Sequence, residues 1–261
     1  MSSSSEDYIE PPETKRDPVV EEMHGHEITD PYRWLEEDND DVKEWIERQN
    51  EYTEEILDDS ILETLRPHLE RVVEHEEFGP MVARGGRYFQ LMSEPDEDQR
   101  KLVVRDSPDG EPRILADPNE FEGVVSVDWF VPDPDGDLIV YGINEGGTEQ
   151  YDLTVLDVEE NEEVMKIPDV GRCNEGAVTW LNDGFYYQKT NAEDQLDKEL
   201  RYVEIDGEDR LITDDIHRKK WPMVFVDQET ETTLVGIGEL GGETELYLLE
   251  DGLTRILPEL E

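Results

Sequence analysis

Residues that could act as a nucleophile are few in this chain of 261 residues. A hydrolytic serine or cysteine needs an adjacent base that removes its proton. Outside the first five residues the serines are four, and their contexts indicate a helix cap (Ser60), a turn (Ser107) and strands (Ser93 and Ser126). The pattern Gly-x-Ser-x-Gly, which holds a nucleophile on a sharp turn, does not occur. We therefore predict no catalytic residue here.

The histidines and the single cysteine give little support for general base or metal chemistry. Most histidines lie in the first third of the chain; only His217 lies far beyond it, in a charged loop. His24 and His26 have the two-residue spacing of strand ligands, but no cysteine or third histidine is near, so turn or surface positions are the better interpretation. Cys173 is a lone thiol, which excludes an internal disulfide, suggests a reducing compartment and indicates a structural role.

Two loop motifs resemble ligand sites, one for calcium and one for phosphate, but each lacks residues that such a site requires. Residues 133–137 read DPDGD, like the start of a calcium loop, but the sixth position is Leu138 rather than glycine and the twelfth is Asn144 rather than glutamate. The glycine pairs at 146–147 and 241–242 lead into predicted strands and carry glutamate, whereas a phosphate loop leads into a helix. We expect hairpin turns, with no metal and no cofactor.

The charge of the chain excludes several classes of partner. There are 71 acidic and 23 basic residues, so the formal net charge is −48. A basic footprint for nucleic acid or anionic lipid is therefore excluded. The acidic residues are dispersed, which is typical of adaptation to concentrated salt, where the Debye length falls to roughly 3 Å at 1 M. Leu, Ile, Val and Phe make up 65 residues, which favours a folded chain over a disordered one.

The termini and hydropathy indicate a cytoplasmic protein without a membrane anchor. The first residues, MSSSSED, have neither a basic region nor an apolar run, so we expect no signal peptide. No stretch approaches the 18 apolar residues that a membrane span needs.

The N-terminal part reads as an arm followed by helices. Residues 1–18 are polar and rich in proline, which predicts an extended arm, and residues 19–77 are expected to form a helical segment. Residues 41–57 carry a helical period, with Asp41 and Glu44 as a capping box. Ser60 and Glu63 form a second capping pair, and Pro67 is expected to interrupt the helix that they begin.

From residue 78 the pattern changes to an alternation of period two that repeats. Four apolar strands, each followed by an acidic turn, end near Asp positions that lie 51, 49 and 45 residues apart: 106, 157, 206 and 251. A period of 45–50 residues with about four short strands per unit is typical of propeller blades. We predict a mainly β fold in which residues 78–261 form about four blades; an irregular β-sandwich is the alternative, but it would lack the long period.

Several of these segments resemble the N-terminal region of the prolyl oligopeptidase family. The most specific is residues 24–36, HGHEITDPYRWLE, which is followed by a matching pattern of Val42, Trp45, Ile46, Gln49 and Asn50. Residues 12–17, 84–89, 103–106, 125–130 and 133–147 continue the resemblance in register. It extends from about residue 10 to the end of the chain.

The resemblance implies a two-domain serine peptidase that cleaves short peptides after proline. In that family a helical arm packs on an α/β-hydrolase domain, and a seven-bladed propeller covers the active site. The family's catalytic Ser, Asp and His lie in the hydrolase domain, and no position of this sequence matches them. We expect this chain to be the arm and about half of the propeller, inactive alone, with the hydrolase domain in the same or a separate chain as its partner.

Three explanations fit a chain that stops after four blades: a split or truncated gene, a partial sequence, or a stand-alone module. The last is disfavoured because the apolar face of the helical arm and one blade face would be left uncovered. A propeller that binds or scaffolds without chemistry remains the alternative function.

Overall fold

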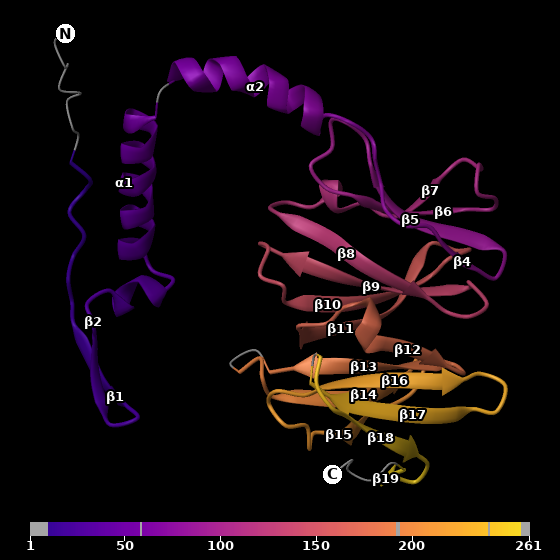
Figure 1. Cartoon of the computed structure of the whole chain (residues 1–261). Helices are drawn as coiled ribbons and strands as arrows, with labels where there is room; N and C mark the ends of the chain where they lie inside the picture. The colour runs from indigo at the N-terminus through magenta and orange to yellow at the C-terminus, as the bar shows by residue number, and fades with distance from the viewer. Residues whose placement is uncertain (1–9, 58, 192–193, 240, 257–261) are drawn as a thin grey trace. The chain divides into compact units, whose positions relative to one another are not determined.

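The structure is a computed structural model that describes residues 10–57, 59–191, 194–239 and 241–256. The chain divides into two compact units, Met1–Val72 and Val73–Glu261, each of which is described by itself (Figure 1). The first nine residues of the predicted arm and the last five of the predicted blades lie outside the described residues. No described helix is long and apolar enough to cross a membrane.

The first unit begins with an extended segment and a β-hairpin. Residues 10–18 have no regular secondary structure, and β1 (Val19–Met23) then pairs antiparallel with β2 (His26–Asp30). The connecting residues have positive φ, 52° at His24 and 80° at Gly25, as a two-residue hairpin turn requires. The prediction of a helical segment from residue 19 was therefore wrong for this stretch, and His24 and His26 are a turn and a strand residue.

The first long helix, α1 (Asp40–Ile56), follows a short 3₁₀ turn, η1 (Arg33–Glu36). Its cap is Asn39, whose side chain accepts the Val42 N–H at 3.1 Å, so the predicted capping role of Asp41 was wrong. Asn39 lies just outside the helix with extended backbone angles, whereas Asp41 is already helical. The indole of Trp45 donates to Thr14 Oγ1 at 3.0 Å and so ties the extended segment to α1.

The second helix, α2 (Asp59–Val73), continues through Pro67. The predicted interruption was wrong: a proline lacks the N–H that would bond to the preceding turn, and here the helix loses that bond without ending. The predicted Ser60 cap cannot be compared, because its side chain lies outside the described residues. Most large apolar residues of α2 are exposed: Ile61, Leu62, Leu65, Leu69, Val72 and Val73.

The second unit consists of four antiparallel sheets; strands pair in chain order except in the first sheet, where the two short leading strands both pair with the third. Blade 1 contains β3 (Glu77–Phe78), β4 (Val82–Arg84), β5 (Arg87–Ser93), β6 (Lys101–Arg105) and β7 (Arg113–Ala116), with η2 (Pro118–Glu120) after it. Blade 2 contains β8 (Val125–Pro132), β9 (Leu138–Glu145), β10 (Tyr151–Asp157) and β11 (Glu162–Gly171). Blade 3 follows η3 (Glu175–Ala177) and contains β12 (Val178–Leu181), β13 (Gly184–Thr190), β14 (Lys198–Glu204) and β15 (Asp209–Thr213). Blade 4 contains β16 (Trp221–Asp227), β17 (Thr232–Gly238), β18 (Thr244–Leu249) and β19 (Leu253–Arg255).

These sheets confirm the predicted repeat. The four predicted apolar segments are the next-to-last strands of the blades, β6, β10, β14 and β18, and each predicted acidic turn leads from that strand into the last strand of its blade. Residues 133–137 form the turn between β8 and β9, where the Asp133 carboxylate accepts the Leu138 N–H at 2.9 Å. Because burial dominates, the pKa of Asp133 is raised despite that bond.

Three apolar clusters hold neighbouring blades together. Phe89 and Leu102 of blade 1 pack with Ile139 of blade 2. Leu153 of blade 2 packs with Phe185 and Tyr187 of blade 3, and the next cluster joins Leu200 of blade 3 to Val235 and Ile237 of blade 4. Each sheet therefore buries a face only by stacking on the next one, as propeller blades do.

Hydrogen bonds between blades recur at the repeat distance. The Trp180 indole of blade 3 donates to the Val131 carbonyl of blade 2 at 3.0 Å, and Gln228 of blade 4 donates to the Trp180 carbonyl at 2.7 Å. Arg87 of blade 1 likewise donates to the Gly136 carbonyl of blade 2 at 2.6 Å. Such bonds fix the register of one sheet against the next.

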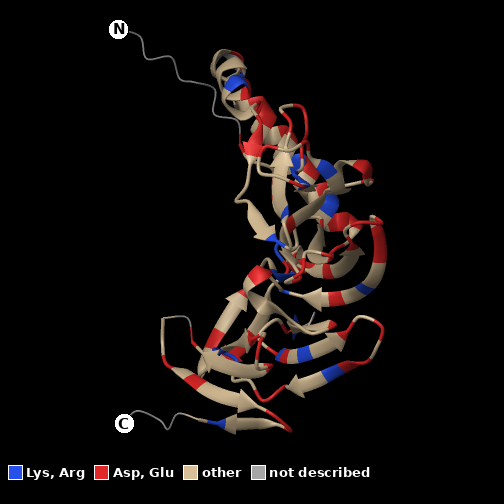
Figure 2. Ribbon diagram, turned by 90° about the vertical axis from the view of Figure 1, so that its right-hand side faces the viewer, with Lys and Arg blue, Asp and Glu red and all other residues tan. Residues whose placement is uncertain are grey.

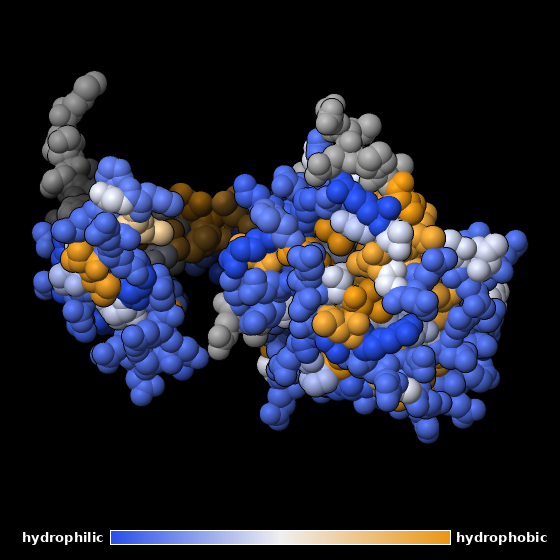
Figure 3. Space-filling model, turned by 90° about the horizontal axis from the view of Figure 1, so that it is seen from below, coloured by the Kyte–Doolittle hydropathy of each residue, from blue (hydrophilic) through white to orange (hydrophobic). Residues whose placement is uncertain are grey.

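One face of blade 4 has no sheet against it among the described residues. Val224 and Ile237 point toward blade 3, whereas Phe225, on the other face, is 54% exposed. Seen from below, Figure 3 shows apolar atoms gathered on this outer face of blade 4. Acidic residues, by contrast, are spread over the loops and strands of both units (Figure 2).

Candidate functional site

The residues considered as nucleophiles or bases are scattered. Ser93 is buried in β5, Ser126 is half-buried in β8, and Ser107 lies in the turn after β6. His217 is in the loop between β15 and β16, where its Nδ1 accepts the Lys219 N–H at 3.3 Å. Within the described ranges no serine hydroxyl is hydrogen-bonded to a histidine, and no three His, Cys, Asp or Glu side chains gather in a group that could hold a metal ion.

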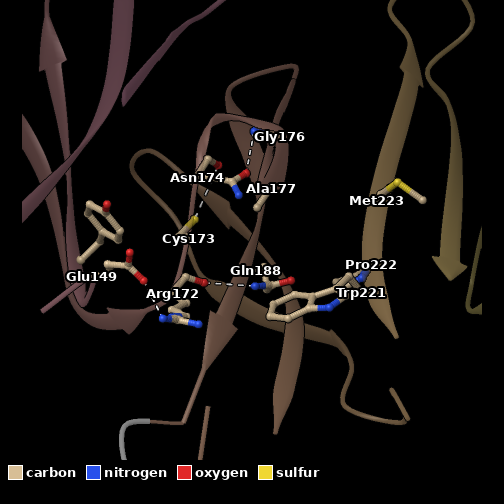
Figure 4. A pocket seen from close by; sticks show the side chains of 11 residues that line it. Glu149, Arg172, Cys173, Asn174, Gly176, Ala177, Gln188, Trp221, Pro222 and Met223 are labelled. Carbon is tan, nitrogen blue, oxygen red and sulfur yellow. Dashed lines mark hydrogen bonds and ion pairs between the residues drawn. The ribbon is translucent and has the colours of Figure 1, made fainter. Parts of the chain in front are cut away.

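A pocket of about 640 Å³ in the second unit is formed by blades 2, 3 and 4 (Figure 4). Its walls come from the loop before β10, the connection from β11 to β12, strand β13 and the start of β16. Tyr151, Ala177, Trp221, Pro222 and Met223 give it apolar surface. We call it the inter-blade pocket.

The connection between β11 and β12 is fixed by close backbone contacts. Gly171 has φ +78°, and a side chain there would meet Thr190 Oγ1 at 2.2 Å, so only glycine fits. The Thr190 hydroxyl accepts the Arg172 N–H at 2.7 Å. Asn174 caps η3 by accepting the Gly176 N–H at 2.9 Å, and Gln188 donates to the Arg172 carbonyl at 3.0 Å. This wall of the pocket is therefore preorganised.

An ion pair lies on the wall of the pocket. The Arg172 guanidinium binds the Glu149 carboxylate, and both side chains are largely exposed. Glu149 has a positive φ of 57°, an unusual conformation for a residue with a side chain. The same conformation occurs at turn residues elsewhere in the chain, such as His24.

Two ionisable groups at the inter-blade pocket, the Cys173 thiol and the Tyr151 hydroxyl, are uncharged at neutral pH. Burial raises the pKa of the Cys173 thiol to about 12, so it is protonated at neutral pH and is a poor nucleophile. Burial and the hydrogen bond to Asp128 raise the pKa of Tyr151, whose hydroxyl donates to that carboxylate at 2.9 Å. Both groups serve the pocket as fixed, uncharged surface.

Trp221 is held by a buried lysine. The Lys198 ammonium lies 4.5 Å from the centre of the indole ring and donates to the carbonyls of Leu196 and Arg218 at 2.7 and 2.9 Å. Burial lowers the pKa of Lys198. The aromatic wall of the pocket is thus supported by a cation, and no local sequence pattern predicts this contact.

The inter-blade pocket was not foreseen from the sequence, because its lining spans residues 149–223 and three blades. The only local signal was the glycine-rich stretch before β10. The prediction that no catalytic residue is present stays a prediction.

Comparison with known proteins places these features in a family. Residues 11–253 match the family model described as the prolyl oligopeptidase N-terminal β-propeller domain. The chain is 26% identical over 193 residues to a prolyl endopeptidase of Elizabethkingia meningoseptica, covering 72% of this chain and 27% of that protein. It therefore spans about a quarter of the length of such relatives.

Solved structures show the same fold. One from an analysis of two prolyl endopeptidases superposes with a TM-score of 0.77 at 21% identity, over 95% of this chain and 40% of that one. Oligopeptidase B of Leishmania major gives a TM-score of 0.75 at 14% identity, with the same coverage of both chains. With a family match over nearly its whole described length, the chain belongs to the prolyl oligopeptidase family, as an N-terminal β-propeller region.

Proposed function

We propose that this chain is the N-terminal part of a prolyl oligopeptidase-like serine peptidase. In this role it supplies the arm and part of the propeller that gates access to a catalytic α/β-hydrolase domain, which is provided in the same or a separate chain. The intact enzyme cleaves short peptides after proline. The propeller region by itself is inactive.

The observation that carries the proposal is the family match over residues 11–253, combined with relatives of which the aligned part covers only about a quarter. The apolar surface of α2 supports it. Leu65, Leu69 and Val72 lie on one helical face and are 47%, 60% and 70% exposed, more apolar surface than a helix usually leaves in water. A hydrolase domain packed against this face would cover it.

The cellular setting is part of the same proposal. The net charge of −48, dispersed over both units, suits a cytoplasm with molar salt, in which repulsion between carboxylates is screened. The lone buried Cys173 suits a reducing compartment.

A binding module without chemistry is the second candidate. The inter-blade pocket favours it, because about 640 Å³ lies within the range of small-molecule sites and its wall is preorganised. A scaffold of this kind would bind its ligand without any hydrolase domain.

The two candidates differ in what restores activity. We expect the chain alone neither to hydrolyse a fluorogenic Gly-Pro peptide nor to react with a fluorophosphonate probe. Adding a hydrolase domain that carries Gly-x-Ser-x-Gly, encoded in a continuing or adjacent reading frame, should produce both signals. A chain that stays inactive with every such domain, yet binds a ligand in the inter-blade pocket, would favour the binding module.

A further inference from the structure

A second, smaller pocket of about 180 Å³ lies where blades 1 and 2 meet the connection into blade 3. Its volume equals that of about six liquid waters, each of which takes roughly 30 Å³. Leu91 and Phe130 contribute apolar wall, and Arg100, Asp128 and Glu175 contribute charge. We call it the charged pocket; it shares no lining residue with the inter-blade pocket.

Arg100 is an unpaired cation in a protein with a large excess of acid. It is half-buried, and no carboxylate oxygen of the described residues lies within 4.0 Å of its guanidinium. The other half-buried or buried arginines of this unit have partners. Arg87 binds Asp137, Arg201 binds Glu199 and Asp209, and Arg105 donates to Gln90 Oε1 at 2.8 Å. A guanidinium left open beside a pocket is a preformed site for a carboxylate.

The acidic side of the pocket is held in place. Asp128 Oδ2 accepts the Tyr151 hydroxyl at 2.9 Å and the Asn144 amide at 3.4 Å. No lysine or arginine of the described part of the chain pairs with Asp128 or with Glu175. Two carboxylates without cations therefore line the same small space as a cation without a carboxylate.

Trp129 carries a buried polar atom without a partner among the described residues, and its indole packs into the cluster between blades 2 and 3. It lines the charged pocket, is 5% exposed, and its indole N–H finds no acceptor within the described structure. A buried donor without an acceptor costs about 1–3 kcal/mol, so native structures rarely leave one unpaired.

We propose that the charged pocket binds a small apolar α-amino acid in its zwitterionic form. The Arg100 guanidinium takes the carboxylate, Asp128 and Glu175 take the ammonium group, and the side chain lies against Leu91 and Phe130. The volume limits the ligand to a short side chain, and opposite charges in one pocket favour a ligand that carries both. This proposal does not depend on peptidase activity.

The test uses L-valine as the probe and compares it with two analogues that each lack one charge. Isothermal titration calorimetry of the full chain, at a salt concentration that keeps it folded, should show saturable binding of L-valine. N-acetyl-L-valine, without the ammonium, and L-valinamide, without the carboxylate, should each bind at least 10-fold more weakly. This comparison needs no substitution.

Substitutions then assign the groups. Arg100→Gln should weaken L-valine binding at least 10-fold. The variant should bind L-valine and L-valinamide with equal affinity, because the guanidinium that binds the ligand carboxylate is gone. Asp128→Asn keeps an acceptor for Tyr151 and should reduce the preference for L-valine over N-acetyl-L-valine, because Glu175 is then the only carboxylate left for the ammonium group. Arg84→Gln, an exposed residue of blade 1 outside the pocket, is the matched control and should bind as wild type. Absence of saturable binding to the folded chain, or equal affinity for all three compounds, would overturn the proposal.

Discussion

At the scale of single residues, burial rather than sequence context sets the reactivity of the only thiol. Cys173 is 5% exposed, and its pKa of about 12 compares with an ordinary value of 9.0. We predict that Ellman's reagent reacts slowly with the folded chain at pH 8 and quickly in denaturant. A native rate as fast as the unfolded one would contradict this burial.

The same pKa shift makes a prediction about stability. The thiol of the unfolded chain ionises near pH 9, whereas that of the folded chain stays protonated up to about pH 12. The free energy of unfolding is therefore unaffected by this thiol below pH 9 and falls as the pH rises from 9 towards 12. At pH 10 the loss is about 1.4 kcal/mol. The free energy of unfolding, measured in urea, should therefore fall more steeply between pH 8 and pH 10 for the wild type than for Cys173→Ala. Tyrosines that also titrate there affect both proteins equally, and parallel pH profiles would refute the expected shift.

At the scale of elements, blade 1 and blade 2 meet at two hairpin tips, and at Gly85 and Gly136 the two backbones lie too close for an added Cβ. A Cβ on Gly85, whose φ is +51°, would lie 1.5 Å from the Asp135 carbonyl oxygen. Gly86 also has positive φ, but a Cβ there would have nothing within 4 Å. We predict that Gly85→Ala destabilises the chain by at least about 2 kcal/mol more than Gly86→Ala, since it adds a clash to the shared strain. Equal costs in thermal unfolding would show that the tips do not touch.

The outer face of blade 4 gives a second prediction at this scale. Phe225→Ala should cost less than about 1 kcal/mol in this chain, because the ring is half in water, whereas Ile237→Ala, 4% exposed on the inner face, should cost about 2–5 kcal/mol. In a longer chain that continues into a further blade, the cost of Phe225→Ala should rise to about 3 kcal/mol. An unchanged cost there would mean that nothing covers this face. Chemical denaturation of both lengths supplies the comparison.

The sequence predicted blades better than it predicted the N-terminal unit, for a physical reason. Blade strands alternate and end in local turns, so β10 or β18 can be recognised within ten residues. Residues 19–23, VVEEM, do not alternate, and the only local sign of the hairpin was Gly25 after His24. Pocket residues such as Arg100 and Trp221 come together only through stacking of sheets, which no local pattern encodes.

At the scale of the whole molecule, the excess of carboxylates governs stability. With a net charge of −48, repulsion opposes the folded state at low ionic strength and is screened near 1 M salt. We predict that the melting temperature rises by more than about 5 °C between 50 mM and 2 M KCl, roughly 2 kcal/mol for a chain of this size. Circular dichroism would measure it. A melting temperature that stays level or falls would remove the case for a high-salt host.

One experiment tests the central claim, that this chain gates a catalytic hydrolase domain and has no peptidase activity of its own. Hydrolysis of a fluorogenic Gly-Pro peptide is measured for this chain alone, for the hydrolase domain alone, and for both together or joined. The account predicts no turnover by the chain alone, and turnover by the pair that exceeds any by the hydrolase domain alone and that responds to changes in the propeller region. Hydrolysis by this chain on its own, or a pair no different from the isolated hydrolase domain, would contradict it.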